Sequence, residues 1–350
     1  MPCDPKKLAL GVVMACLALA AMAAPAGAGA AAGAAAMAAG SGSAAGAGAA
    51  GAEVSAVSAV SAAAGFQFGL ADYEPATFSD PRVAELGVRN ARDVVPWNVV
   101  AVPRDLAAVS AWLAAVRQAG ITPLITFQHA DGNDRAPTRA QFLKDFLRFR
   151  ALFPWVSEFC PWDEATHAGQ PTARHPKLAA QYYDAIASHC SGCIVTAPDT
   201  LDADGNIERW IGQFLRSAHP YPKIWPLNPY ISVSTDNSRA IRRLLSYVHG
   251  QVWFSEVGGI VWWRFHGKLI YHGVAYAAKV AKNIFKLAAI SPRITRVYYY
   301  HWRSPGTPQT AKKSTWDAGL VSASGVARPA LLVVAKALHR QLQTATPSSF

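Results

Sequence analysis

Val-Ser-Glu-Phe-Cys-Pro-Trp-Asp-Glu, residues 156–164, is a short apolar and aromatic run that ends in two carboxylates. Similar runs, rich in β-branched and aromatic residues, recur after Gly65 and are typical of buried strands. Between them lie longer segments with the 3.6-residue apolar period of a helix. The strand-like runs begin near Phe66, Ala91, Thr122, Val156, Cys193, Ile224, Gln251 and Arg296.

Several of the intervening segments have one apolar helical face. The first such face comprises Leu106, Val109, Trp112, Leu113 and Val116, in a helix expected to end at Gly120. Two more comprise Phe142, Phe146, Leu147 and Phe153, and then Ile207, Trp210, Ile211, Phe214 and Leu215. A last helix is expected from Pro329 to Gln343, because proline is favoured in the first turn of a helix.

The strand-like runs are evenly spaced. The first and the eighth start 296 − 66 = 230 residues apart, which is about 33 residues per unit over seven intervals. Eight strand–helix units of that size close a (β/α)8 barrel, or TIM barrel. An open doubly wound sheet is the alternative, but residues 68–72 lack the glycine-rich phosphate turn of such folds. We therefore predict an α/β fold with a single (β/α)8 barrel domain over residues 65–350.

The amino-terminal part of the sequence differs from the rest. Lys6 and Lys7 precede an apolar stretch and the small-residue site Ala24-Pro25-Ala26, which is typical of a secretory signal over residues 1–25. An uncleaved anchor is the alternative. Residues 26–64 are almost entirely Ala, Gly and Ser, which predicts a flexible linker. We expect a secreted, extracellular protein, or one tethered at the cell surface.

The chain carries a formal net charge of +11. A basic domain can bind nucleic acid or an anionic cell-surface polymer, or can simply have a basic solvated surface. The basic residues are scattered and no nucleic-acid-binding motif is present, so nucleic acid is not an expected partner. Beyond Ala64 no uncharged apolar run approaches the roughly 20 residues that span a bilayer, which excludes a multi-pass membrane protein.

The active site of a (β/α)8 barrel lies at the carboxyl ends of its strands. The residues at those positions are polar, acidic and aromatic, as a site for sugar hydroxyls and C–H faces requires. In chain order they are Asp72, Arg92, Trp97, Gln128, His129, Trp162, Asp163, Glu164, Asp199, Asn228, Pro229, Tyr230, Glu256, His301 and Trp302.

Two glutamates stand out at these strand ends. Glu164 follows the fourth run and Glu256 follows the seventh, on facing sides of an eight-stranded ring. Hydrolysis of a glycosidic bond needs two carboxyl groups, one to protonate the leaving oxygen and one to attack the anomeric carbon or activate water. The alternative for each residue is an ordinary salt-bridged carboxylate.

At these residues the sequence resembles the clan A glycoside hydrolases, the retaining (β/α)8 family that includes cellulases, β-xylosidases and α-L-iduronidases. Residues 162–167, Trp-Asp-Glu-Ala-Thr-His, resemble the Trp-Asn-Glu-Pro-Asn block of the acid/base, and residues 254–258, Phe-Ser-Glu-Val-Gly, resemble the nucleophile block. The resemblance implies that Glu164 is the acid/base and Glu256 the nucleophile, with no cofactor. Residues 316–320 and 328–330 are similar to the final loop and helix of the family.

The same resemblance assigns the sugar contacts. It implies that Arg92 orients the nucleophile, that Tyr230 donates a hydrogen bond to it, and that Trp302 forms the sugar platform. The sequence departs from the family at Asp163, where the family usually has asparagine, and at residues 228–230, Asn-Pro-Tyr in place of His-x-Tyr. The expected substrate-binding residues are Arg92, Trp97, His129, Trp162, Asp163, Asn228, Tyr230 and Trp302.

The cysteines and histidines do not form a metal motif. Cys190 and Cys193 lack the second pair that a zinc site needs, so we expect a local disulfide, with Cys160 free and buried. None of the ten histidines belongs to an HExxH-type array.

Taken together, the paired glutamates and the family resemblance predict a secreted retaining glycoside hydrolase that acts on a poly- or oligosaccharide. A non-catalytic carbohydrate-binding barrel is the alternative, because of Asp163 and the irregular segment 228–230.

Overall fold

The computed structural model of the chain describes residues 65–130, 135–203, 207–265, 268–309 and 315–342. The expected signal over 1–25, the expected linker over 26–64 and the far end of the last expected helix lie outside the described residues. Within the described part, no helix has both the length and the apolar character needed to cross a membrane.

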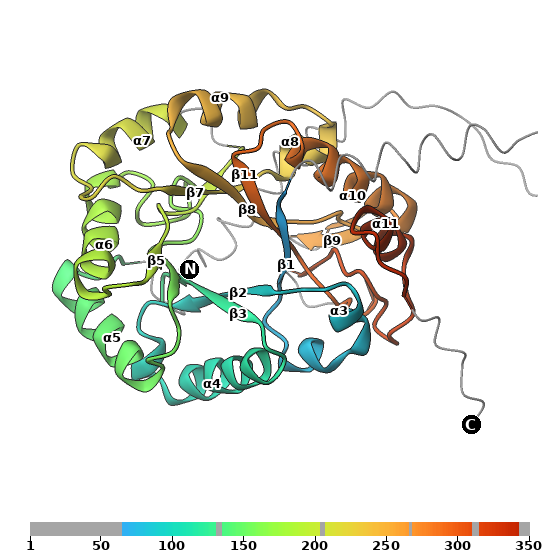
Figure 1. The fold of residues 1–350 in the computed structure, drawn as a ribbon, viewed down its shortest axis with the longest axis horizontal. Helices are drawn as coiled ribbons and strands as arrows, with labels where there is room; N and C mark the ends of the chain where they lie inside the picture. The colour runs from blue at the N-terminus through green and yellow to red at the C-terminus, as the bar shows by residue number, and fades with distance from the viewer. Residues whose placement is uncertain (1–64, 131–134, 204–206, 266–267, 310–314, 343–350) are drawn as a thin grey trace, which may run out of the picture.

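Nine parallel strands form a sheet that curls around a central axis, in the order β5-β4-β3-β2-β1-β11-β8-β7-β6. The helices form a ring outside it (Figure 1). The strands are β1 (Gln67–Ala71), β2 (Asn90–Pro96), β3 (Thr122–Gln128), β4 (Glu158–Cys160), β5 (Ile194–Val195), β6 (Thr200–Leu201), β7 (Ile224–Asn228), β8 (Gln251–Val257) and β11 (Ile294–Tyr299).

The two edge strands, β5 and β6, are halves of one strand position. Between them, Thr196 N donates to Phe159 O of β4 at 3.0 Å, and Ala197 N donates to Ile224 O of β7 at 2.8 Å. Residues 194–201 therefore form hydrogen bonds with β4 on one side and with β7 on the other, which closes the ring of strands. Eight strand positions result, each beginning within two residues of the predicted start, so the predicted (β/α)8 barrel is confirmed.

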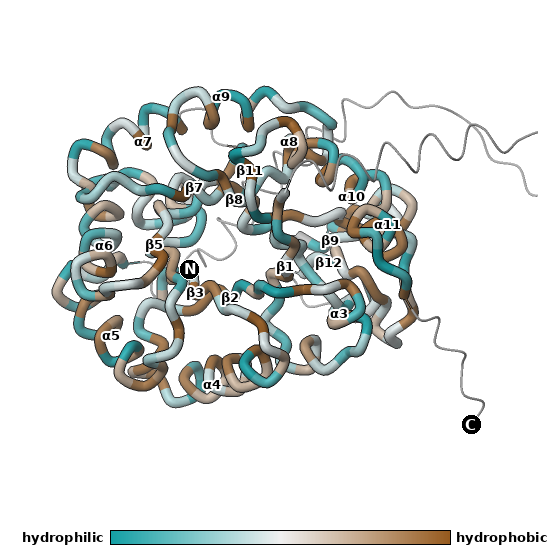
Figure 2. Tube along the Cα trace, viewed as in Figure 1, coloured by the Kyte–Doolittle hydropathy of each residue, from teal (hydrophilic) through white to brown (hydrophobic). Residues whose placement is uncertain are grey.

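The helices follow the strands and turn their apolar faces inward, as the alternating colours along the tube in Figure 2 show. They are α3 (Pro81–Glu85), α4 (Pro103–Gln118), α5 (Arg139–Leu152), α6 (Pro176–His189), α7 (Ile207–Leu215), α8 (Tyr230–Thr235), α9 (Arg239–Tyr247), α10 (Val274–Ala288) and α11 (Pro329–Ala337), with short 3-10 helices η1 (Pro75–Ser79) and η2 (Val99–Ala101).

Two details of the helix prediction were wrong. Leu147 is 42% exposed, because the buried face of α5 passes instead through Phe142, Phe146 and Phe149 at i, i+4 and i+7. The last helix stops at Ala337 and not at Gln343, because His339 takes a left-handed conformation (φ 54°) just beyond the helix end.

A small antiparallel sheet beside the barrel was not predicted. It has the order β10-β9-β12, with β9 (Trp262–Phe265), β10 (Lys268–Tyr271) and β12 (Thr315–Asp317). The chain enters this sheet through Gly258, directly after β8. Its backbone lies against the backbone of Tyr300, so closely that a Cβ at this position would lie 1.9 Å from the Tyr300 carbonyl oxygen.

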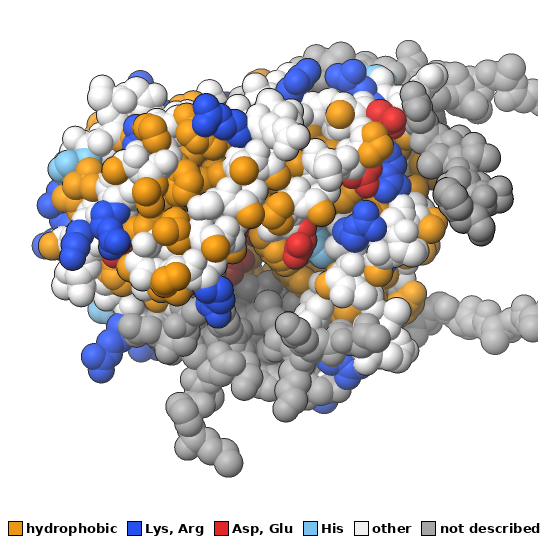
Figure 3. Space-filling view, turned by 90° about the horizontal axis from the view of Figure 1, so that it is seen from below, with side chains coloured by type: hydrophobic (Ala, Val, Ile, Leu, Met, Phe, Trp, Pro, Cys, Tyr) orange, Lys and Arg blue, Asp and Glu red, His pale blue; other side chains and the backbone are white. Residues whose placement is uncertain are grey.

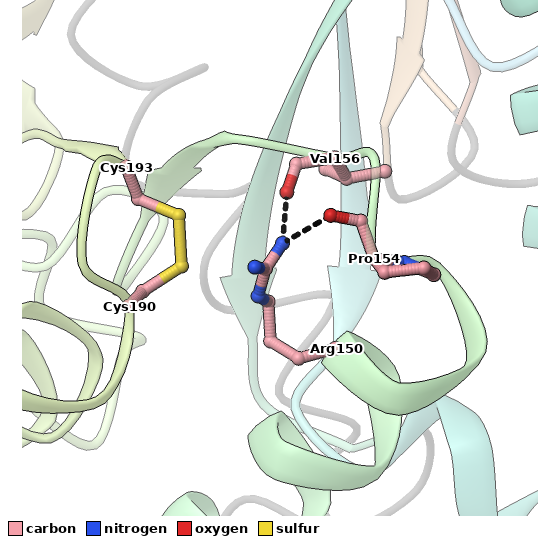
Figure 4. Close-up of a disulfide and its surroundings, with 5 residues drawn as sticks. All are labelled: Arg150, Pro154, Val156, Cys190 and Cys193. Atoms are coloured by element: carbon pink, nitrogen blue, oxygen red, sulfur yellow. Dashed lines mark hydrogen bonds between the residues drawn. A yellow bond between two sulfur atoms is a disulfide. The ribbon is translucent and has the colours of Figure 1, made fainter.

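As predicted, Cys160 is free and buried, and a local disulfide joins Cys190 to Cys193 at the end of α6 (Figure 4). Beside the disulfide, the Arg150 guanidinium at the end of α5 donates to the carbonyl oxygens of Pro154 and Val156, which fixes the turn that leads into β4.

One face of the molecule carries Lys and Arg side chains in several separate places, and fewer Asp and Glu side chains (Figure 3).

The lower part of the barrel interior contains a buried ion pair. Arg296 on β11 contacts Glu158 on β4, with Nη1 and Oε2 2.5 Å apart. These strands are not neighbours in the sheet, so the contact crosses the interior. The same guanidinium lies 3.9 Å from the ring centroid of Trp253 on β8. Above this level, Leu124, Cys160 and Tyr298 fill the barrel.

Glu158→Ala removes one partner of this buried pair. We expect it to lower the free energy of unfolding by about 3–5 kcal/mol, because it leaves the Arg296 charge buried without compensation. The surface pair of Arg243 and Glu208 is the matched control, and Glu208→Ala is expected to cost less than about 1 kcal/mol. Urea denaturation measures both; equal losses for the two variants would contradict the prediction.

Candidate active site

The centre of the site is the guanidinium of Arg92, whose side chain has no exposed surface. Its Nη1 donates to Glu256 Oε2 at 2.7 Å, and its Nε donates to Thr126 Oγ1 at 3.1 Å. Its Nη2 donates to Asp163 Oδ1 at 2.5 Å and to Asp199 Oδ2 at 2.9 Å. One residue of β2 therefore holds three carboxylates, which come from strand positions four, five and seven.

Glu256, near the end of β8, is held at both carboxylate oxygens. Oε2 accepts from Arg92, and Oε1 accepts from the Tyr230 hydroxyl at 3.0 Å. Burial raises the pKa of Glu256, and the adjacent Arg92 charge opposes that rise. A carboxylate with a cation on one oxygen and a hydroxyl donor on the other is oriented and favoured in its ionised form.

Glu164, just beyond β4, has a different environment. Burial raises its pKa well above the ordinary value, and the charges of Asp163, Glu256 and Asp199 raise it further. Asn228 Nδ2 donates to its Oε1 at 3.4 Å, and no lysine or arginine of the described residues pairs with it. Glu164 is therefore favoured in its protonated form.

The backbone at Glu164 is left-handed, with φ 40°, a conformation that non-glycine residues adopt at an energetic cost. Hydrogen bonds on both sides hold it. Asp163 N donates to Phe127 O of β3 at 2.7 Å, and Ala165 N donates to Asp199 O at 2.7 Å. The loop that carries the acidic pair is thus anchored to two strand positions.

Asp199 completes the acidic cluster and lies in the gap between β5 and β6. Its side chain is fully buried, and burial raises its pKa to about 8. Ser255 Oγ lies 3.0 Å from Asp199 Oδ1 and 3.0 Å from Asn228 Oδ1. The sequence placed Asp199 at a strand end but did not select it as a site residue; in the structure it positions Arg92.

Six of the predicted site residues come together in the barrel mouth. Arg92, Asp163, Asn228 and Tyr230 join Glu164 and Glu256 through the hydrogen bonds described above. Burial raises the pKa of both glutamates, but only Glu256 has the Arg92 cation to oppose the rise. A carboxyl pair with pKa values separated in this way can carry out general acid catalysis at one member and nucleophilic attack at the other. The described residues include no group of three or more His, Cys, Asp or Glu side chains arranged to hold a metal.

The other four predicted residues lie elsewhere. Trp162 is fully buried in the wall, where its indole N–H donates to Gln170 and its ring stacks on Tyr182. Trp302 is also fully buried, and its indole N–H donates to Asp80. Neither ring has an exposed face to offer a sugar.

Trp97 and His129 lie nearer the rim, at the ends of β2 and β3. Trp97 is half-buried, and its indole nitrogen has no hydrogen-bond partner among the described residues. His129 is buried, with Nδ1 3.2 Å from the Ala130 carbonyl oxygen. Neither side chain is bonded to the acidic cluster in the described part.

Aromatic side chains that the sequence reading missed line the site. The half-buried Trp316 of β12 lies 5.1 Å from the Tyr230 ring and 5.4 Å from the Tyr300 ring, between centroids. The exposed Tyr73 places its hydroxyl 2.5 Å from that of Tyr300. The sequence contained one signal for Tyr300. Side chains alternate between the two faces of a strand, and accordingly Tyr298 and Tyr300 pack in the barrel interior, whereas Tyr299 packs toward the helices.

No protein family profile and no curated protein sequence matches this chain. Solved structures do. A GH5_18 protein from Streptomyces cattleya, in complex with GlcNAc, is 15% identical, with 81% of each chain covered and a TM-score of 0.57. Xylanase 10B from Thermotoga maritima is 11% identical over 80% of this chain and 97% of its own, with a TM-score of 0.58.

A β-glucosidase from Exiguobacterium marinum is 12% identical over 74% of this chain and 85% of its own, with a TM-score of 0.51. All three neighbours are (β/α)8 glycoside hydrolases, and identities this low speak for the fold alone. The chain has the (β/α)8-barrel fold of the clan A glycoside hydrolases, as the sequence resemblance predicted.

Proposed function

We propose that the chain is a retaining glycoside hydrolase in which Glu256 is the nucleophile and Glu164 the acid/base. The observation that carries the proposal is the contrast between the two glutamates. Glu256 is bonded to the Arg92 guanidinium and the Tyr230 hydroxyl, whereas Glu164 has carboxylates nearby and, among the described residues, no paired cation. The fold of the structural neighbours supports the same activity.

The reaction proceeds in two displacements. A carboxylate oxygen of Glu256 attacks the anomeric carbon while the bond from that carbon to the leaving oxygen breaks, and Glu164 transfers its proton to the leaving oxygen. In the second step a water molecule gives a proton to Glu164 and attacks the anomeric carbon. The bond to Glu256 then breaks, and both glutamates return to their starting states.

The charges and rings of the site restrict the sugar. Asp163 and Glu256 lie at the reaction centre, and Arg92, the cation that the described residues place beside them, already pairs with both and with Asp199. A sugar bearing a carboxylate or a sulfate at the cleaved position would be repelled, so the proposed sugar is uncharged at that position. The half-buried ring of Trp316, packed beside Tyr300, offers an aromatic surface on which its C–H face can stack.

The expected signal and linker support a secreted or cell-surface location. If the chain is exported, the mature protein recovered from the medium will begin near Ala26, which mass spectrometry of its amino terminus would establish.

Substitution of the two glutamates tests the proposal on a panel of aryl glycosides and polysaccharides. Glu164→Gln should lower kcat/KM about 10²–10⁴-fold for poor leaving groups, because general acid catalysis is lost. The loss should be smaller for a dinitrophenyl glycoside, whose leaving oxygen needs no proton. Glu256→Gln should lose turnover on every substrate, because no covalent intermediate forms. Proton NMR of the first product should show the retained anomer.

Glu208→Gln, at the surface pair with Arg243, is the matched control and should keep wild-type activity. Turnover that survives in Glu256→Gln would remove the nucleophile from the proposal. Glycan binding by the wild type without hydrolysis of any substrate would favour the non-catalytic alternative.

The pH profile tests the role of Asp163. Its negative charge raises the pKa of both Glu164 and Glu256. Activity needs Glu164 protonated and Glu256 ionised, so it falls as pH rises through the first pKa and as pH falls through the second. Asp163→Asn should therefore move both limbs of the kcat/KM profile to lower pH. An unchanged or upward-shifted alkaline limb would contradict this account.

A further inference from the structure

A groove with a volume of about 490 Å³ lies between α6 and α7, in the ring of helices around the barrel. Three of the side chains that line it are cationic: Arg174, Lys177 and Arg216. Gln181 and Gln213 supply amide groups, and no aspartate or glutamate lines the groove. The chemistry of these side chains suits a ligand that carries negative charge and accepts hydrogen bonds.

The three cations have no anionic partner in the part of the chain that the structure describes. No ion pair joins Arg174, Lys177 or Arg216 to a carboxylate of the described residues, and all three side chains are exposed. Asp184, farther along α6, accepts from His219 N and does not line the groove. Three unpaired like charges on one groove repel one another, and a bound anion would relieve that repulsion.

The helix that borders the groove adds to the positive potential. α6 is 14 residues long and begins at Pro176; its N-cap, His175, makes no side-chain cap hydrogen bond, and its first turn has no acidic residue. The partial positive charge of a helix N-terminus is therefore not offset by the sequence there. Arg174 and Lys177 flank this end of the helix.

The groove is linked to the catalytic centre by one ordered loop. Residues 161–175 carry Glu164 near one end and Arg174 near the other, and α6 and α7 are neighbours in the helix ring (Figure 1). Thr172 fixes the loop: its Oγ1 donates to Ala165 O at 3.0 Å, and its carbonyl oxygen accepts from Trp210 of α7 at 3.2 Å. The loop that carries Glu164 therefore continues directly into the lining of the groove.

We propose that the α6–α7 groove is a second carbohydrate-binding site, which holds the sulfate or carboxylate groups of an acidic polysaccharide. The choice of polymer rests on the proposed function, whereas the preference for an anion rests on the groove alone. The carboxylates of the catalytic centre repel such groups, so a polysaccharide that carries them must place them elsewhere on the protein. The groove offers such groups three cations without ion-pair partners among the described residues, in a concave site.

The test uses the full chain with Glu256→Gln in the background, so that binding is measured without turnover. The groove variant combines Arg174→Gln, Lys177→Gln and Arg216→Gln. The matched control combines Lys279→Gln, Lys282→Gln and Lys336→Gln, which removes the same charge from exposed lysines of α10 and α11 that do not line the α6–α7 groove. Dextran sulfate, polygalacturonate and neutral dextran are titrated by calorimetry, and thermal melts check that both variants fold.

The groove variant should bind the acidic polysaccharides about ten-fold more weakly or worse, as the loss of three charge contacts implies, and the control variant should bind nearly as the parent does. The sulfated and the uronate polymer distinguish the two anion types, and neutral dextran should not engage the groove. Equal weakening in the two variants would overturn the proposal, because binding would then follow net charge alone.

A nucleic acid is the remaining polyanion to separate from a polysaccharide. Tighter binding of a single-stranded oligonucleotide than of either acidic polysaccharide, lost in the groove variant, would also overturn the proposal. Because all of these measurements concern binding, their outcome is independent of the glycoside assays. A failure of the groove and a failure of the catalytic proposal are therefore distinguishable.

Discussion

The architecture of the site depends on the way one buried guanidinium bonds to three carboxylates. Arg92 has no access to water, so its charge requires compensation inside the barrel, and the carboxylates of Asp163 and Glu256 already carry more negative charge than it needs. The excess negative charge acts on Glu164, which has no cation of its own. The same interaction therefore orients one glutamate and keeps the proton on the other.

Two charged levels of the interior are separated by an apolar one. Arg296 and Glu158 neutralise each other at the lower level, and Leu124, Cys160 and Tyr298 fill the space above them. The acidic cluster lies on top of this layer. The ion pair that stabilises the barrel therefore lies near the amino-terminal ends of the strands, and the acidic cluster lies near their carboxyl-terminal ends. In (β/α)8 barrels generally, the first end contributes to stability and the second carries the active site.

The sequence was sufficient for the barrel and for the centre of the site, because strand runs and their terminal carboxylates are visible as periodic patterns. It did not reveal which way a side chain points. Trp162 and Trp302 stand at the expected strand ends, yet both rings are buried in the wall, whereas Tyr300 and Trp316 face the site. The sheet that holds Trp316 depends on pairing between distant segments, β9 and β12, which no local pattern indicates.

That sheet has an evolutionary consequence. Trp316 packs against Tyr230 and Tyr300 from a segment that belongs to none of the eight barrel strands, and β12 pairs with β9 outside the ring of strands. Insertions or deletions around this appendage can exchange the aromatic wall while the guanidinium and its carboxylates stay in place. Under the proposed function, descendants of such a chain can diversify in the saccharides they accept without rebuilding the guanidinium–carboxylate cluster.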